Sequence, residues 1–167
     1  MHTPSDIRRV VRQRTFDHVL GMVYQQGRPA LKRGTCAYRG EKGTKCGIGH
    51  ILPDADYLPQ FDDAGLGGGA VTTVLTCDTD SPTRRAVRLA FKRALRAGGA
   101  DPDDVEFLQG LQSAHDQSKP DDNMEPKMAT VDFRRRFTTK METLAQRYGL
   151  EMRTTDWCLA YVPPAVP

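Results

Sequence analysis

Two cysteines and a histidine stand close together in the run TCAYRGEKGTKCGIGHILPD, residues 35–54. Cys36 and Cys46 flank a glycine-containing turn, and His50 follows Cys46 by four residues. If a helix begins near Gly47, that spacing places Cys46 and His50 on one face of it. Thiolate sulphur and imidazole nitrogen are ligands that zinc prefers in proteins. The spacing therefore predicts three ligands for a structural zinc ion.

A fourth zinc ligand has to come from elsewhere in the chain, and the candidates are His115, Cys77 and Cys158. His115 is favoured because it closes an otherwise apolar helix face and is followed by Asp116, which can orient its imidazole. The predicted metal ligands are Cys36, Cys46, His50 and His115.

Two other interpretations of these residues stay open. Cys36 and Cys46 are equally compatible with buried structural thiols beside a hydrogen-bonded histidine, because free cysteine is among the most buried residue types. Alternatively, Cys46 is a nucleophile beside Lys45, with His50 or His115 as its base. A small metal- or thiol-dependent enzyme centred on Cys46, His50 and His115 is therefore the alternative function.

A run of basic residues marks the predicted helix at 82–97, which contains no acidic residue. Four of them recur at steps of four and two more widen the stripe; together they are Arg84, Arg85, Arg88, Lys92, Arg93 and Arg96. A solvated helix face usually mixes charges of both signs, so this stripe predicts contact with nucleic acid or with an acidic or nucleoprotein partner, and a plain solvated face stays the alternative. Aromatic residues do not interleave with the basic ones, which argues against base stacking.

The elements that must position these residues are mostly helical. Hydrophobic spacing and capping residues predict helices at 5–26, 82–97, 102–116 and 131–148. A β-hairpin is predicted from residues 35–39 and 44–48, and a strand at 156–162. We expect one α+β, α-rich domain over residues 1–167, with about four helices, a short cysteine-containing β-hairpin and a small sheet. Glycine and proline predict flexible loops at 62–72 and 117–129 and a disordered tail at 163–167.

Composition limits the class of protein. The chain has 167 residues, 38% of them hydrophobic, and carries a net charge of +3. That length is enough for one domain with a real core. No segment approaches the length of a membrane span, and the N-terminus lacks the apolar region of a secretory signal. We therefore expect a cytoplasmic protein with no membrane partner, whose cysteines are reduced.

The run from Cys36 to Tyr57, with FLQGLQSAHD downstream, resembles a family of small, uncharacterised proteins from phages and prophages. The shared pattern is Cys-x-Tyr-Arg, a glycine turn, Lys-Cys-x-Ile-Gly, then Cys or His, and Pro-Asp. The matching residues are Cys36, Tyr38, Arg39, Lys45, Cys46, Ile48, Gly49, His50, Pro53, Asp54, Tyr57, Leu111, Gln112, His115 and Asp116. The resemblance covers residues 36–116 and implies a phage accessory role, such as host takeover or blocking of a defence, in the cytoplasm of a bacterial host. Its partner would be nucleic acid, a host protein or a nucleoprotein complex. Interchange of Cys and His at position 50 favours a metal ligand there.

Overall fold

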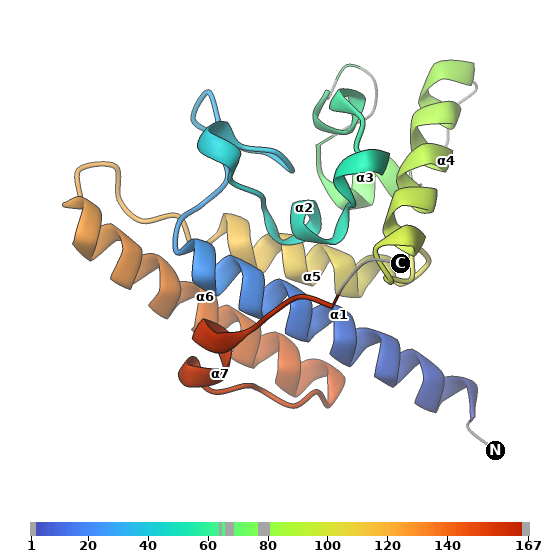
Figure 1. Ribbon diagram of the computed structural model, residues 1–167. Helices are drawn as coiled ribbons and strands as arrows, with labels where there is room; N and C mark the ends of the chain where they lie inside the picture. The colour runs from blue at the N-terminus through green and yellow to red at the C-terminus, as the bar shows by residue number, and fades with distance from the viewer. Residues whose placement is uncertain (1–2, 64, 66–68, 77–80, 165–167) are drawn as a thin grey trace.

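The computed structural model of the protein describes residues 3–63, 65, 69–76 and 81–164 (Figure 1). These residues form a mostly helical single domain with a short antiparallel hairpin that contains Cys36, which confirms the predicted fold class. The helices are α1 Pro4–Gln26, α2 Gly47–Ile51, α3 Val71–Thr76, α4 Pro82–Ala97, α5 Val105–Asp116, α6 Pro126–Tyr148 and α7 Thr155–Ala160. The strands are β1 Leu31–Lys32 and β2 Thr35–Cys36, and the 3-10 turns are η1 Glu41–Gly43, η2 Asp54–Asp56 and η3 Pro59–Asp62. None of the helices among the described residues is both long and apolar enough to cross a membrane.

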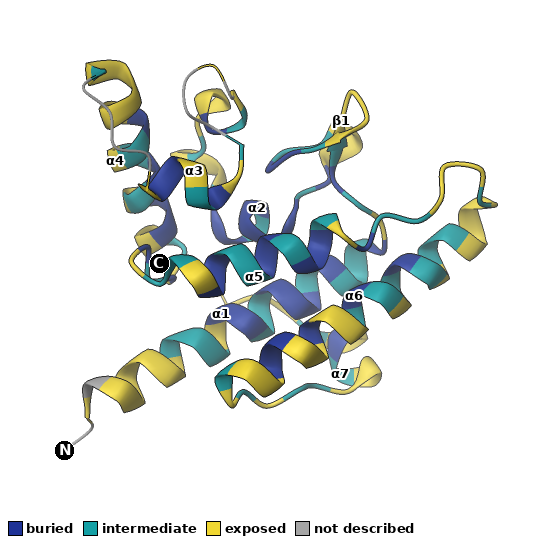
Figure 2. Cartoon of the chain, turned by 180° about the vertical axis from the view of Figure 1, so that it is seen from behind, coloured by how far each residue is buried: buried dark blue, intermediate teal, exposed yellow. Residues whose placement is uncertain are grey.

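Helix α1 lies through the middle of the molecule and packs against α2, α5, α6 and α7 (Figure 1). It begins with a capping box, in which the Thr3 hydroxyl and the Asp6 carboxylate each accept a backbone N–H of the other residue. Its central turns carry the buried residues Phe16, Val19, Leu20 and Val23. Its first turns extend beyond the core and are exposed (Figure 2).

Helices α5 and α6 pack against each other and against α1. Both begin at residues other than those predicted. Helix α5 begins at Val105, because the Asp101 carboxylate accepts the N–H of Asp103 and closes a turn before the helix. Helix α6 begins at Pro126, five residues before the predicted start, because Glu125 caps it and proline fits the first helical position.

The hairpin contains Cys36 as predicted, but its strands are shorter and lie earlier in the chain. Leu31 pairs with Cys36, and only an isolated bridge between Arg39 and Lys45 remains of the predicted pairing around GEKG. The predicted second strand ends early because Cys46 caps helix α2, so residues 47 and 48 are helical, and the N–H of Ala37 donates to the Ala30 carbonyl on the β1 side. The side-chain amide of Gln26 binds the N–H and the carbonyl of Lys45, at 2.8 and 3.0 Å, and so fastens this segment to α1.

The predicted strand at 156–162 is wrong, because residues Thr155–Ala160 form helix α7. The Thr154 hydroxyl accepts the N–H of Trp157 and starts the helix. The Gln25 amide then donates to the carbonyls of Cys158 and Tyr161, at 3.0 and 2.7 Å, and holds α7 on α1. Capping and docking thus outweigh the β-propensity of the sequence.

The two predicted flexible loops contain ordered contacts. Within 62–72, residues 64 and 66–68 lie outside the described residues, whereas α3 begins at Val71, whose N–H donates to the Gln112 side chain at 2.8 Å. Within 117–129, Ser118 is fully buried and its hydroxyl donates to the Ala114 carbonyl. Residues 165–167 of the predicted disordered tail also lie outside the described residues.

Candidate metal centre and basic helix

Arg39 holds the segment that carries Cys46 and His50. Its guanidinium donates to the carbonyls of Gly49 and Leu52, at the end of α2, and to the Asp54 carboxylate at 2.8 Å. Since the last carbonyls of a helix have no partner within it, this side chain satisfies groups that α2 leaves open. The Arg and Pro-Asp positions of the motif therefore have a structural explanation.

Asp62 fixes the other side of the same segment. Its carboxylate accepts the backbone N–H of Tyr38 at 2.7 Å and that of Arg39 at 3.3 Å, and also the Tyr57 hydroxyl at 2.7 Å. Tyr38 itself is buried against Phe91 of α4. These contacts pack the segment after β2 against η3 and α4.

Cys46 caps α2 inside the core. Its Sγ accepts the N–H of Gly49 at 3.3 Å, and the residue is 1% exposed. Burial raises the pKa of the Cys46 thiol well above its usual range, and the negative charge of Asp116 adds to the effect. A neutral, buried thiol with a backbone partner has a structural role here.

His50 is held neutral in the fold. Burial, followed by the positive charges of neighbouring groups, lowers the pKa of His50 to about 3. Its Nε2 is buried and has no hydrogen-bond partner, whereas its backbone carbonyl accepts a hydrogen bond from His18 at 3.0 Å. The imidazole nitrogen is therefore available to a ligand only if the surrounding side chains move.

His115 is fully buried at the end of α5, and both of its ring nitrogens are engaged. Nε2 accepts the N–H of Ala30 at 3.1 Å, which places the ring proton on Nδ1. Nδ1–H then donates to the Asp116 carboxylate at 2.8 Å. The loop before β1 is thus fastened to the end of α5.

Cys36, His115 and Asp116 form a group that could hold a metal ion, since one ligand atom from each lies within 4.8 Å of the others. Two of the four predicted ligands, Cys36 and His115, are in this group, whereas Cys46 and His50 are not. Asp116 was predicted only to orient the imidazole, yet its carboxylate could supply a ligand atom. Because carboxylates also bind zinc, the adjacent His115 and Asp116 in the sequence could have indicated that both are candidate ligands.

The hydrogen bond to Ala30 sets a condition on metal binding. An ion that binds Nδ1 must displace the Nδ1 proton, which is now hydrogen-bonded to Asp116. The imidazole can carry that proton on Nε2 only if Nε2 stops accepting the N–H of Ala30. Losing the Ala30 bond would leave a buried N–H without a partner, at a cost of about 1–3 kcal/mol. Metal binding therefore requires a local rearrangement around Ala30.

The same group is poorly arranged for thiol catalysis. Burial, and next the charge of Asp116, raises the pKa of Cys36 to about 12. A nucleophilic cysteine needs a thiolate next to a free imidazole nitrogen. Here the His115 imidazole is bonded to the Asp116 carboxylate through Nδ1 and to the N–H of Ala30 through Nε2, so neither nitrogen is free to act as a base.

Of the other two candidate ligands, Cys158 does not join this group. Cys158 is buried on α7, and Cys77 lies outside the described residues.

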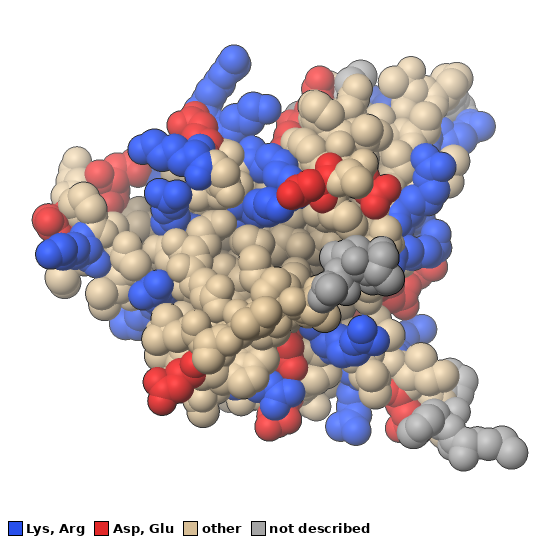
Figure 3. Space-filling model, viewed as in Figure 1, with Lys and Arg blue, Asp and Glu red and all other residues tan. Residues whose placement is uncertain are grey.

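Helix α4 presents its basic residues outward. Arg84, Arg85, Arg93 and Arg96 are exposed and Arg88 and Lys92 are half-buried, while Val87, Phe91, Ala94 and Leu95 are buried on the opposite side. Lys92 and Arg96 both pair with the Asp103 carboxylate, at 3.0 and 3.7 Å. The basic side chains follow the outer edge of the helix in Figure 3.

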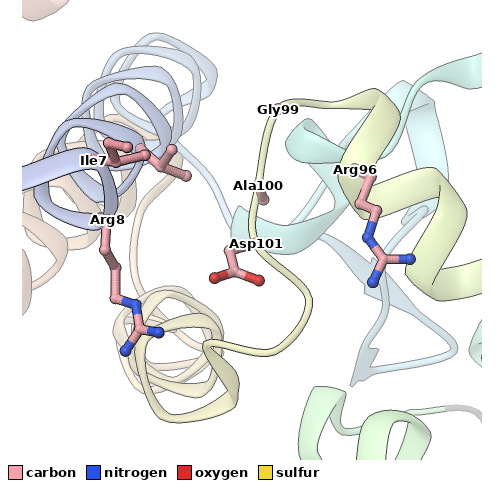
Figure 4. A pocket seen from close by; sticks show the side chains of 7 residues that line it. Ile7, Arg8, Arg96, Gly99, Ala100 and Asp101 are labelled. Atoms are coloured by element: carbon pink, nitrogen blue, oxygen red, sulfur yellow. The ribbon is translucent and has the colours of Figure 1, made fainter. Parts of the chain in front are cut away.

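An open hollow of about 460 Å³ continues the basic surface beyond the end of α4. It lies between α1 and the α4–α5 connection, with Arg96 on one side and Arg8 of α1 on the other (Figure 4). Asp101 stands between them, and Ile7, Val11 and Ala100 supply apolar lining.

Comparisons with protein-family models, with curated proteins and with solved structures find no match to this chain. The fold and the site define a small helical protein with a Cys-His-Asp group and a basic outer helix. The phage resemblance of residues 36–116 stays a prediction.

Proposed function

We propose that the protein is a phage-type accessory protein that binds nucleic acid through the outer face of α4. The observation that carries the proposal is the charge of this helix, which has six basic residues and no acidic one. Backbone phosphates need cations without base-specific geometry, and arginine suits them because its planar fork donates two parallel hydrogen bonds.

The internal ion pairs do not neutralise α4. Asp103 is shared between Lys92 and Arg96, and no ion pair to Arg85 or Arg93 exists among the described residues. Asp103 is itself 66% exposed, and exposed pairs contribute little to stability. A polyanion can therefore compete with Asp103 for these cations at small cost to the fold.

The orientation of the helix also supports the proposal. Ser81 caps the start of α4, and the apolar side of the helix packs against α3, η2 and η3. The basic side is consequently held outward in one orientation, and Arg8 across the hollow extends it onto α1. Such preorganisation lowers the entropic cost of binding.

The test is fluorescence anisotropy with a labelled DNA duplex and a single strand of the same sequence, at several salt concentrations. The charge-reversal variant Arg85→Glu/Arg93→Glu should weaken binding by more than tenfold and reduce the salt slope by about two phosphate equivalents. Lys127→Glu/Lys140→Glu, which makes the same charge change on the exposed face of α6, is the matched control. Equal losses in both variants, or no binding by the wild type, would contradict the proposal, and an acidic protein would then be the partner to examine.

We also propose zinc as the ion that the Cys36, His115 and Asp116 group takes, in a structural role. Support comes from the donor types and from the position of the group, since an ion there would join β2 to the end of α5. Zinc should raise the melting temperature of the wild type and lose this effect in Cys36→Ser, but keep it in His50→Gln. A protein purified without chelator that contains no zinc and shows no zinc-dependent shift would rule the site out.

A further inference from the structure

Two exposed basic residues adopt a backbone conformation that their side chains disfavour. Arg33 has φ 52° and Lys42 has φ 56°, and no other residue except glycine has a positive φ in the described part of the chain. Each is followed by a glycine that is also left-handed, Gly34 with φ 79° and Gly43 with φ 71°. Turns of this kind favour asparagine, aspartate or glycine at the first position. Strained positions of this kind often mark functional sites.

The two turns are tied to each other. The N–H of Arg33 donates to the Glu41 carboxylate at 3.1 Å, and the Arg28 guanidinium donates to the Lys42 carbonyl at 3.5 Å. Within the second turn, the Thr44 hydroxyl and N–H both donate to the Glu41 carbonyl. Residues 32–34 and 41–43, which we name the basic turn pair, are therefore held side by side.

The three cations of the basic turn pair face solvent and outnumber its one carboxylate, that of Glu41. Lys32, Arg33 and Lys42 are exposed, and none of them forms an ion pair in the described structure. Basic side chains gather at this end of the molecule, at the upper left of Figure 3, apart from those along α4. The turns expose no aromatic or large apolar side chain, so they lack the anchors of a typical protein–protein interface.

We infer that the basic turn pair is a second contact for the phosphate groups of a nucleic acid, separate from α4; the inference rests on the proposed function. Exposed cations on ordered turns suit sequence-independent contact with phosphates. The chain keeps arginine and lysine where asparagine would fit the backbone better, which is consistent with a function that depends on their charge.

The same conformational preference gives a clean test. Arg33→Asn/Lys42→Asn removes two charges and supplies a residue that tolerates the left-handed region, so the melting temperature should stay equal or rise. Binding of the labelled DNA duplex should nevertheless weaken by roughly tenfold, with a smaller salt slope. Lys127→Asn/Lys140→Asn is the matched control, and its affinity should stay near that of the wild type.

The outcomes separate this inference from the proposed function. If Arg33→Asn/Lys42→Asn binds DNA like the wild type while Arg85→Glu/Arg93→Glu does not, the basic turn pair is no contact site and α4 remains the interface. If the asparagine variant and its control lose affinity equally, the effect is one of net charge and the inference is overturned. If the wild type binds no nucleic acid, both proposals are wrong.

Discussion

At the scale of single residues, the motif around the cysteines is mainly a framework. Cys46 caps α2, Arg39 satisfies its last carbonyls, and His115 holds the N–H of Ala30. Cys36 differs from these three residues, because its half-buried thiol lies beside a carboxylate and not beside a backbone group. It is therefore the residue of the motif most open to a ligand.

The Asp116 charge should make Cys36 unreactive. Burial is the largest cause of the rise in the pKa of this thiol to about 12, and the charge of Asp116 is the second largest. Asp116→Asn removes the negative charge, so the thiolate should become easier to form and native-state alkylation of Cys36 should accelerate severalfold at about pH 8. Peptide mass spectrometry reports the modification at Cys36 separately from the other cysteines. An unchanged rate, or the same acceleration in the exposed-site control Glu142→Gln, would show that Asp116 does not control the thiol.

At the scale of elements, short segments depend on distant side chains. Helix α2 has only five residues, and Arg39 binds the carbonyls at its end. Helix α7 is similarly short and is held by Gln25 of α1. Isolated helices of this length are unstable in water, so tertiary contacts must keep them folded.

Replacing Arg39 should therefore destabilise the protein. Arg39→Lys keeps the positive charge but cannot reach two carbonyls and the Asp54 carboxylate together. We expect the free energy of unfolding to fall by about 1–3 kcal/mol in denaturant titrations. Lys45→Gln is the control, because it removes only a pair with the 76%-exposed Asp54 and should cost less than about 1 kcal/mol. Equal effects would mean that the guanidinium fork is not what holds α2.

At the scale of the whole molecule, charge is distributed in blocks. Basic residues gather on α4 and on the basic turn pair, and the aspartates of 54–63 lie between them in the chain. Because only some of these charges pair internally, the molecule keeps separate basic surfaces. Such surfaces attract polyanions and raise the rate of encounter with them.

Global stability should fall in mild acid because of His50. Its pKa is about 3 in the fold and near 6.5 in an unfolded chain, so only the unfolded state gains a proton as the pH drops below about 6.5. The contribution of neutral His50 to the free energy of unfolding is therefore present at neutral pH and is lost toward pH 3, at up to ~1.4 kcal/mol per pH unit. Between about pH 7 and 5.5, the wild type should lose about 1 kcal/mol more than His50→Gln in urea titrations. Parallel pH profiles for the two proteins would show that His50 is not the group responsible.

Local patterns in the sequence determined the long helices and the outward face of α4. Hydrophobic spacing and caps such as Ser81 act within a few residues, so the sequence alone carries these signals. That Cys36 lies in a β-hairpin was also predicted, although the turn forms at Arg33-Gly34 and not at GEKG.

Contacts between distant residues decided the rest. The amide of Gln26 fastens the backbone of Lys45 to α1, and the amide of Gln25 holds α7, a predicted strand, on the same helix. The candidate metal group likewise joins Cys36 to the end of α5, where His115 binds the N–H of a residue 85 positions away. Side-chain hydrogen bonds over such separations depend on how the helices pack, and no local spacing in the chain specifies them.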